Sequence, residues 1–338
     1  GDKGLEAAVE KDFVIRVNKT VEKQDISITL KDVIIDTSKA ELFYEIVNES
    51  EIYNGISIDD LEFFDQSGNK LIFSYDMYSM PIESHDKDVR TLSVHFLGSD
   101  TEIPEEFNLS IKIKNQDYNE DGSIGEKIVL KDTWKFSFNI DKDKLLEMVE
   151  EREINKTIEI EGQKVRFKKA RITPTLISLE MEMPEDNTKK LLTFEDIEIV
   201  NEKGVVWGRP QGVTGAIGEN ELTLYFQSSY FSDSKELYVR GSAVRALDKD
   251  KLEVIFDLDK EEVVKAPDST LHFDIAERSE DSTTISFTYE DRLPKLYSKD
   301  GEEINTGYFI FQHDIIGDRG ELLEIAPMSN YGADPNEG

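Results

Sequence analysis

One loop carries side-chain oxygens at the spacing of a calcium site. Asp117, Asn119 and Asp121 occupy alternate positions before Gly122, as the first, third and fifth ligands of a calcium-binding loop do. The twelfth position, where such a loop has a bidentate Glu, is Ile128. The same segment also suits a β-hairpin, in which Asp and Gly serve the geometry of the turn. Ca²⁺ is therefore the candidate cofactor, with these three residues as its metal ligands, and the hairpin turn is the alternative.

Nothing in the sequence selects a catalytic centre. The chain has no cysteine, and its four histidines form no metal-spaced pair: His85, His95, His272 and His313. No HExxH, GxSxG or GxxxxGK[ST] motif occurs, and these are the local signatures of zinc proteases, serine hydrolases and phosphate-binding loops. His95 and His272 lie in alternating sequences and are predicted to occupy polar strand faces. We predict that the chain is not an enzyme and has no catalytic or cofactor-binding residues.

The charge of the chain excludes several classes of partner. Lys and Arg total 40 against 72 acidic residues among 338, which gives a net charge of -32. A surface this negative repels phosphate backbones and anionic lipid headgroups, so we expect no nucleic-acid partner. No apolar stretch approaches the roughly 20 residues that a membrane-spanning helix needs. We therefore expect contact with a membrane only through a helix upstream of this sequence.

Alternating apolar residues predict β-strands along most of the chain. Trp134, Phe136, Phe138 and Ile140 alternate with polar residues, which is typical of a half-buried strand. Many short strands separated by turn clusters indicate a sandwich or barrel. A helix is predicted only over residues 141–153, as a linker. The predicted fold class is all-β, with tandem immunoglobulin-like antiparallel β-sandwich domains and a short linker helix.

The sequence repeats itself, and the repeat defines the predicted domains. VNKTVEKQDISITL beginning at position 17 resembles INKTIEIEGQKVRF beginning at position 154, and DLEFFDQSGNKL (60–71) resembles DIEIVNEKGVVW (196–207). A shorter third unit follows, with STLHFDIAERSEDSTTISFTYE (269–290) echoing the first strand pair. We predict an N-terminal β-sandwich over 1–142, a second immunoglobulin-like sandwich over 143–263, and a smaller β-rich unit with a flexible tail over 264–338.

The two long repeats carry a family resemblance. KDVIIDTSKAELFYEI with the closing WKFSFNID resembles the ectodomain family of unknown function in membrane-anchored anti-sigma-factor-like proteins of Firmicutes. The second repeat, with YFQSSYFSDSKELYVR, resembles the immunoglobulin-like domain that commonly follows it. The resemblance covers about residues 5–262. It implies a cytoplasmic segment and one membrane-spanning helix upstream, with this region on the extracellular face of the cell membrane, and it carries over no functional residue.

Two functions follow as expectations. The first is an extracytoplasmic sensor or regulatory ectodomain, which receives a signal by binding an extracellular ligand or protein, or through strain passed along rigid tandem domains. The alternative is a cell-surface adhesin or a carbohydrate-binding module of the cell wall. A cell-wall hydrolase is a third class, which turnover of peptidoglycan would reveal.

Overall fold

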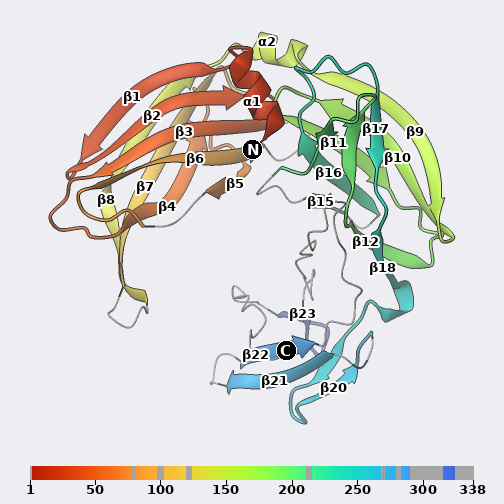
Figure 1. Ribbon diagram of the computed structural model, residues 1–338. Coiled ribbons are helices and arrows are strands. Elements are labelled where there is room, and N and C mark those ends of the chain that lie inside the picture. The colour runs from red at the N-terminus through yellow and green to blue at the C-terminus, as the bar shows by residue number, and fades with distance from the viewer. Residues whose placement is uncertain are drawn as a thin grey trace. The chain divides into compact units, whose positions relative to one another are not determined.

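Antiparallel β-sheets make up most of the protein, and the predicted all-β, sandwich-like fold class is confirmed (Figure 1). The structure is a computed structural model. It describes residues 2–77, 81–96, 103–118, 124–210, 215–218, 220–267, 269, 271–278, 283–289 and 315–323. Two compact units divide the chain, residues 1–289 and 290–338. In the second unit the structure describes one hairpin, β23 (Ile315–Ile316) with β24 (Leu322–Leu323).

The first β-domain consists of a five-stranded and a three-stranded sheet. The five-stranded sheet has the order β1 (Ile15–Lys23), β2 (Ile26–Ile35), β3 (Lys39–Asn48), β6 (Asp86–Phe96) and β5 (Phe73–Met77). The three-stranded sheet has the order β4 (Ile56–Phe64), β7 (Glu106–Tyr118) and β8 (Ile124–Asn139). Side chains from both sheets form one continuous core. Trp134 is fully buried there, and its indole N–H donates to the Ile26 carbonyl at 3.1 Å, so its predicted core position is confirmed.

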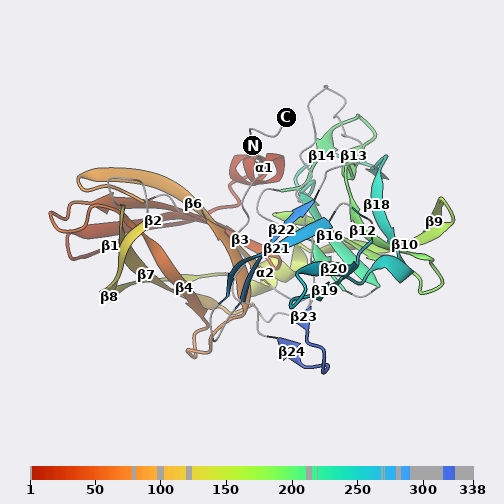
Figure 2. The same ribbon diagram turned by 90° about the horizontal axis from the view of Figure 1, so that it is seen from below.

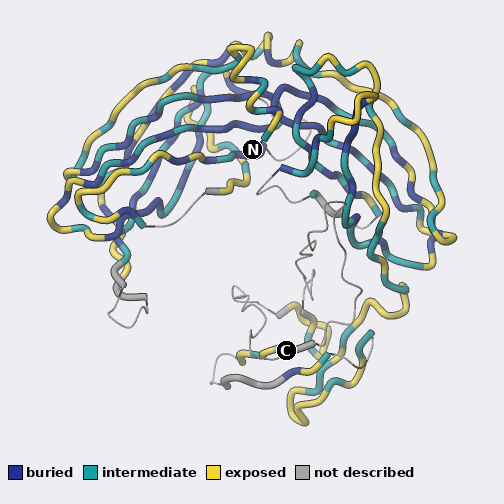
Figure 3. The backbone as a smooth tube through the Cα atoms, in the orientation of Figure 1, coloured by how far each residue is buried: buried dark blue, intermediate teal, exposed yellow. Residues whose placement is uncertain are grey.

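The second β-domain repeats this plan, and several of its strands are shorter. Its five-stranded sheet has the order β15 (Ala216–Ile217), β16 (Glu221–Gln227), β11 (Leu176–Glu182), β10 (Gln163–Ile172) and β9 (Glu150–Ile160). The other strands are β14 (Val206–Trp207), β13 (Glu198–Asn201) and β17 (Leu237–Arg240) in one sheet, and β12 (Lys189–Phe194) with β18 (Val244–Asp248) in another. They enclose a second core that contains Trp207. In both β-domains the buried residues lie along the strands, and the exposed residues gather at the loops that join them (Figure 3).

The backbone repeats at the spacing seen in the sequence. Asn18 and Asn155 both have positive φ, at an offset of 155 − 18 = 137. Each lies at a β-bulge in an edge strand. The hairpin turns at 24–25 and 161–162 also have positive φ, at the same offset of 161 − 24 = 137. Two successive residues with positive φ make the type I′ turn that suits the twist of a hairpin. The two β-domains are therefore copies of one module at the level of single residues.

Two short helices flank the first β-domain, and the sequence predicted only one of them. The linker helix α2 spans Lys142–Glu147, with the Asp141 carboxylate as its N-cap. The predicted extension to residue 153 is wrong, because β9 begins at Glu150 and pairs with β10. Helix α1, Lys3–Glu10, was not predicted; Asp2 caps it by accepting from the N–H groups of Gly4 and Leu5. Among the described residues no helix is long and apolar enough to span a membrane.

The chain after β18 forms small two-stranded sheets. A 3₁₀ turn over Lys249–Lys251 leads into β19 (Ile255–Asp257) and β20 (Glu262–Lys265). β21 (Leu271–Arg278) then pairs with β22 (Thr283–Tyr289). Phe256 and Phe273 join these two sheets, edge to face, with ring centroids 5.0 Å apart. The boundaries of the three predicted domains stay a prediction.

Candidate functional site

The predicted calcium loop lies at the tip of the β7–β8 hairpin. Asp117 belongs to β7, whereas Asn119 and Asp121 lie outside the described residues. The two strands pair as far as Tyr118 and Ile124. Across the described part of the chain, no group of three His, Asp or Glu side chains is placed to hold a metal ion. Calcium binding stays a prediction.

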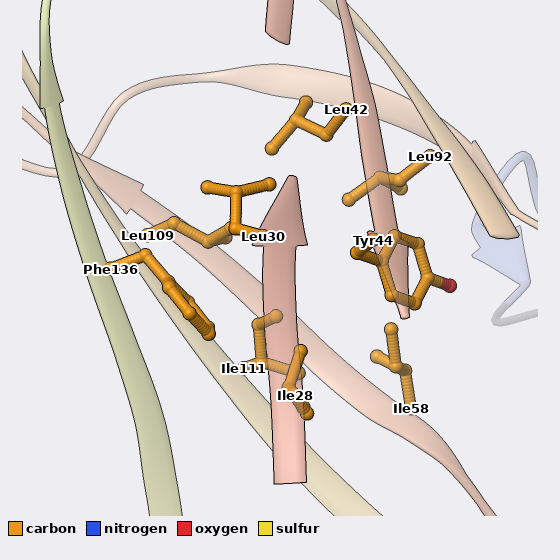
Figure 4. Close-up of a pocket in the computed structure, with 9 residues that line it drawn as sticks. All are labelled: Ile28, Leu30, Leu42, Tyr44, Ile58, Leu92, Leu109, Ile111 and Phe136. Atoms are coloured by element: carbon orange, nitrogen blue, oxygen red, sulfur yellow. The ribbon is translucent and has the colours of Figure 1, made fainter. Parts of the chain in front are cut away.

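The core of the first β-domain contains a small apolar cavity (Figure 4). Its volume is about 10 Å³, close to the minimum that a single water molecule needs. Nine side chains line it: Ile28, Leu30, Leu42, Tyr44, Ile58, Leu92, Leu109, Ile111 and Phe136. The Tyr44 hydroxyl is buried and makes no hydrogen bond within the described residues. Burial raises the pKa of Tyr44 to about 12. The cavity is a packing imperfection rather than a ligand pocket.

A buried charged cluster lies on the five-stranded sheet of the first β-domain, on the face that points away from the cavity. Lys39 and Glu41 on β3 form an ion pair at 2.7 Å, with both side chains less than 10% exposed: 3% and 6%. Ser93 on β6 donates its hydroxyl to the Glu41 carboxylate at 2.9 Å. His95, also on β6, pairs in register with Lys39. We name these four residues the charged cluster.

His95 is the unusual member of the charged cluster. Its Nε2 is buried without a hydrogen-bond partner among the described residues. Burial, and then the nearby Lys39 ammonium, lower the pKa of His95 to about 4. The prediction that His95 occupies the polar face of a strand is confirmed in position, but this face is covered rather than solvated. His272 lies on β21 and is exposed.

A polar network lies where the two β-domains meet. The turn from β2 to β3, residues 36–39, faces the turn from β10 to β11, residues 173–176, and we name them the paired turns. Asp36 is fully buried, and one of its carboxylate oxygens accepts from the N–H of Thr175 at 2.6 Å. The Thr173 hydroxyl donates to the Ser38 hydroxyl across the same junction at 3.4 Å.

The paired turns are equivalent parts of the repeated module. Asp36 and Thr173 are related by the offset 173 − 36 = 137, and each closes its own turn with a side-chain oxygen. The Asp36 carboxylate accepts from the N–H of Lys39 at 3.1 Å, and the Thr173 hydroxyl accepts from the N–H of Leu176 at 3.3 Å. The same turn thus meets its own copy, as in an isologous interface between two identical subunits.

Arg171 strengthens the contact between the turns. Its guanidinium donates to the Ser38 hydroxyl at 3.0 Å and to the Thr37 hydroxyl at 2.7 Å. Hydrogen bonds from a charged donor are about twice as strong as those between neutral groups. These contacts join the ends of the two sheets that the turns terminate.

Helix α1 adds a second contact between the β-domains. Figures 1 and 2 show it between the strands of the first β-domain and those of the second. Lys3 donates through its ammonium to the Val206 carbonyl at 3.0 Å. Gly4 lies so close to Ser228 that an added Cβ would come within 2.7 Å of the Ser228 nitrogen. After the helix, the rings of Phe13 and Phe231 contact with centroids 5.6 Å apart.

Ser228 connects the helix contact to the paired turns. Its hydroxyl donates to the Thr173 carbonyl at 2.5 Å, while its backbone contacts Gly4. A continuous path therefore runs from α1 through Ser228 to the turn of residues 173–176, and from there to Asp36. The arrangement joins the two β-domains through hydrogen bonds and close packing.

Residues 149–275 match a family of unknown function, DUF5643. The match begins directly after α2 and ends within β21, so it includes Arg171, Thr173 and Ser228 on the second side of the junction. Asp36 and α1 lie outside it. The sequence analysis expected a family of unknown function in this chain, and a match of that kind is confirmed. It lies in the second repeat, for which the sequence predicted the immunoglobulin-like domain, and not in the first. No curated protein matches the chain.

A solved structure is also similar to this chain. It is described as the crystal structure of the conserved domain protein from Bacillus anthracis, with 16% sequence identity and a TM-score of 0.45. The similarity covers 84% of this chain and 93% of that chain.

The sequence did not predict the junction, although one signal pointed to it. DTSK at 36–39 and TPTL at 173–176 fall at matching positions of the repeat. Each places small polar residues between two strongly apolar strands. Polar residues there predict a solvated turn, and only the meeting of the two copies makes them buried.

Proposed function

We propose that this chain is the extracytoplasmic sensor or regulatory ectodomain of a membrane-anchored anti-sigma-factor-like protein, and that it acts by binding and not by catalysis. The observation that carries the proposal is the junction, where Asp36 is fully buried against Thr175 of the second copy. Two β-domains on a flexible linker would need no such contact. A buried, satisfied polar network favours one arrangement over the alternatives, and transmission of a signal along the chain requires such a fixed arrangement.

The composition supports a role outside the cytoplasm. The chain has no cysteine and a net charge of -32. A negative ectodomain is repelled by anionic headgroups, which holds it away from the membrane surface that its proposed upstream helix crosses. The extracellular ligand or protein that it binds would then reach both β-domains from solution.

The output of the proposed protein can be measured in the bacterium that encodes it. The native gene is compared with an in-frame deletion of residues 15–289, in a strain that reports transcription by the sigma factor that the protein is proposed to regulate. We expect the full-length protein in the membrane fraction and a changed reporter level in the deletion strain. Unchanged transcription, together with recovery of the native protein in the soluble fraction, would overturn the proposal.

A third strain separates regulation from loss of protein. It carries Asp36→Asn, which keeps the shape of the side chain but weakens its acceptance of the Thr175 N–H. We expect normal protein levels and a reporter shifted in the direction of the deletion. The control is Asp65→Asn, in an exposed turn where the equivalent residue of the second β-domain is already Asn201. Glycan-array binding by the purified chain, with an unaffected reporter in all strains, would favour an adhesin instead.

A further inference from the structure

Helix α1 has little stability of its own. It has eight residues, of which only Gly4 and Ala8 are buried. An isolated helix of this length is marginal in water, because too few hydrogen bonds repay its nucleation. Its stability therefore comes from the cap by Asp2 and from its contacts with the second β-domain. An element of this kind belongs to the low-stability end of a folded protein, which opens locally before the rest.

The contacts of α1 span both β-domains. The chain runs from α1 directly into β1, and Phe13 packs against the core of the first β-domain. Lys3 and Gly4 contact the second β-domain at the Val206 carbonyl and at Ser228. The helix therefore crosses the junction. Detachment of α1 removes these contacts without breaking a strand of either sheet.

The paired turns depend on the same residue that α1 covers. Ser228 supports the turn of residues 173–176 through the Thr173 carbonyl, and that turn presents the Thr175 N–H to Asp36. Since Gly4 contacts the backbone nitrogen and oxygen of Ser228, a shift of the helix moves the support of the turn. The helix and the paired turns are thus coupled through one serine.

We propose that α1 is a detachable strap, which holds the two β-domains in one orientation, and that its release opens the paired turns. In the closed state the Asp36 carboxylate accepts the Thr175 N–H, and in the open state water replaces that donor. The device goes beyond the proposed regulatory function, because it is a conformational equilibrium of this chain whatever the chain binds.

Hydrogen exchange on the purified chain tests the strap. Gly4→Val places a branched side chain where even a Cβ meets Ser228 backbone atoms. We expect amide exchange to rise about tenfold or more across residues 4–10 and at Thr175, while protection at Ile28 and Leu42 in the core stays unchanged. The matched control is Gly208→Val, because a Cβ at Gly208 meets no atom of the described residues within 4 Å. It should exchange like the parent.

A milder variant keeps the test valid if Gly4→Val does not fold. Lys3→Ala removes the hydrogen bond to the Val206 carbonyl and introduces no clash, and its control is Lys11→Ala, just after the helix. We expect a smaller rise in exchange, at the same amides, for Lys3→Ala only.

A disulfide gives the reverse experiment. The chain has no cysteine, so Ser38→Cys with Thr173→Cys creates a single pair at positions whose hydroxyls are 3.4 Å apart. We expect the pair to oxidise readily, and the rate to fall about tenfold when Gly4→Val is added. The proposal is overturned if the pair does not oxidise in the otherwise native chain. It is also overturned if α1 loses protection while Thr175 keeps it, or if Gly208→Val has the same effect as Gly4→Val.

Discussion

The two β-domains share their turns but differ on the outer face of their five-stranded sheets. Asp65 and Asn201, at an offset of 201 − 65 = 136, each accept two backbone N–H groups of their own turn. The turn has a glycine with positive φ in both copies, Gly68 and Gly204. A turn of this kind depends on local geometry, and both copies keep it.

The outer face of the five-stranded sheet, which points away from the core, differs between the two β-domains. Lys39 and Glu41 of the charged cluster correspond to Leu176 and Ser178, at the offset of 137. His95, which pairs in register with Lys39, corresponds to Gln227, which pairs with Leu176. The second β-domain thus forms the same sheet without the buried ion pair. The module does not need these charges in order to fold, and their presence in the first copy is specific to that position in the molecule.

The largest expected effect on stability comes from removing one partner of the ion pair between Lys39 and Glu41. Glu41→Ser gives the first copy one residue of the second and leaves the Lys39 ammonium buried without its partner. We expect a loss of about 3–5 kcal/mol in the free energy of unfolding, because an unpaired buried charge is costly. Urea unfolding at pH 7 measures it.

The double variant Lys39→Leu with Glu41→Ser sharpens the comparison. It reproduces Leu176 and Ser178 of the second copy. We expect a free energy of unfolding within about 1 kcal/mol of the native value, since both charges are removed together and neither is left buried without its partner. A double variant as unstable as Glu41→Ser alone would show that the fold of the first copy requires the charges.

The next effect is a dependence on pH. His95 has a pKa of about 4 in the folded protein against an ordinary 6.5, so the unfolded chain takes up the proton first. The contribution of neutral His95 to stability is complete above pH 6.5 and is lost as the pH falls towards 4. The loss amounts to about 3 kcal/mol.

His95→Gln copies Gln227 of the second β-domain and removes this titration. The difference in the free energy of unfolding between native protein and variant, measured from pH 7 to pH 4, isolates the histidine from the carboxylates that titrate in the same range. We expect the native protein to lose stability relative to the variant as the pH falls. Parallel curves would mean that His95 titrates equally in both states.

Tyr44 gives a smaller effect of opposite sign. It corresponds to Met181 at the offset of 137, and its buried hydroxyl has no partner among the described residues. We expect Tyr44→Phe to stabilise the protein by about 1–2 kcal/mol at pH 7, because an unsatisfied polar group is removed. Since burial raises the folded pKa of Tyr44 to about 12, the native protein should lose more stability above pH 10 than the variant does. Thermal unfolding of both proteins at pH 7 and pH 10.5 measures this.

Features that depend on the period of the strands and on turn chemistry could be predicted from the sequence. Trp134 and Phe136 alternate with polar residues, and both fill the core. The same period places Glu41 on the face opposite to Leu42, where a carboxylate is expected in water. It is buried because other parts of the fold cover that face, and local alternation contains no information about a cover. Helix α1 was missed for the same reason, since its docking partner Ser228 lies 224 residues after Gly4 in sequence, 228 − 4.

The smallest expected effect on stability comes from the turn glycine that both β-domains share. Gly68 and Gly204 have φ of +85° and +78°, and within the described part of the chain an added Cβ would meet nothing within 4 Å at either. The cost of alanine there is therefore backbone strain alone, about 1 kcal/mol at each site. Gly208→Ala, also in open space but without positive φ, should change the free energy of unfolding by no more than a few tenths of a kcal/mol. Equal losses for the two turn variants would show that the turn acts alike in both copies. Unequal losses would mean that the stability of the turn depends on the β-domain around it. The two β-domains would then differ in more than the outer face of their five-stranded sheets.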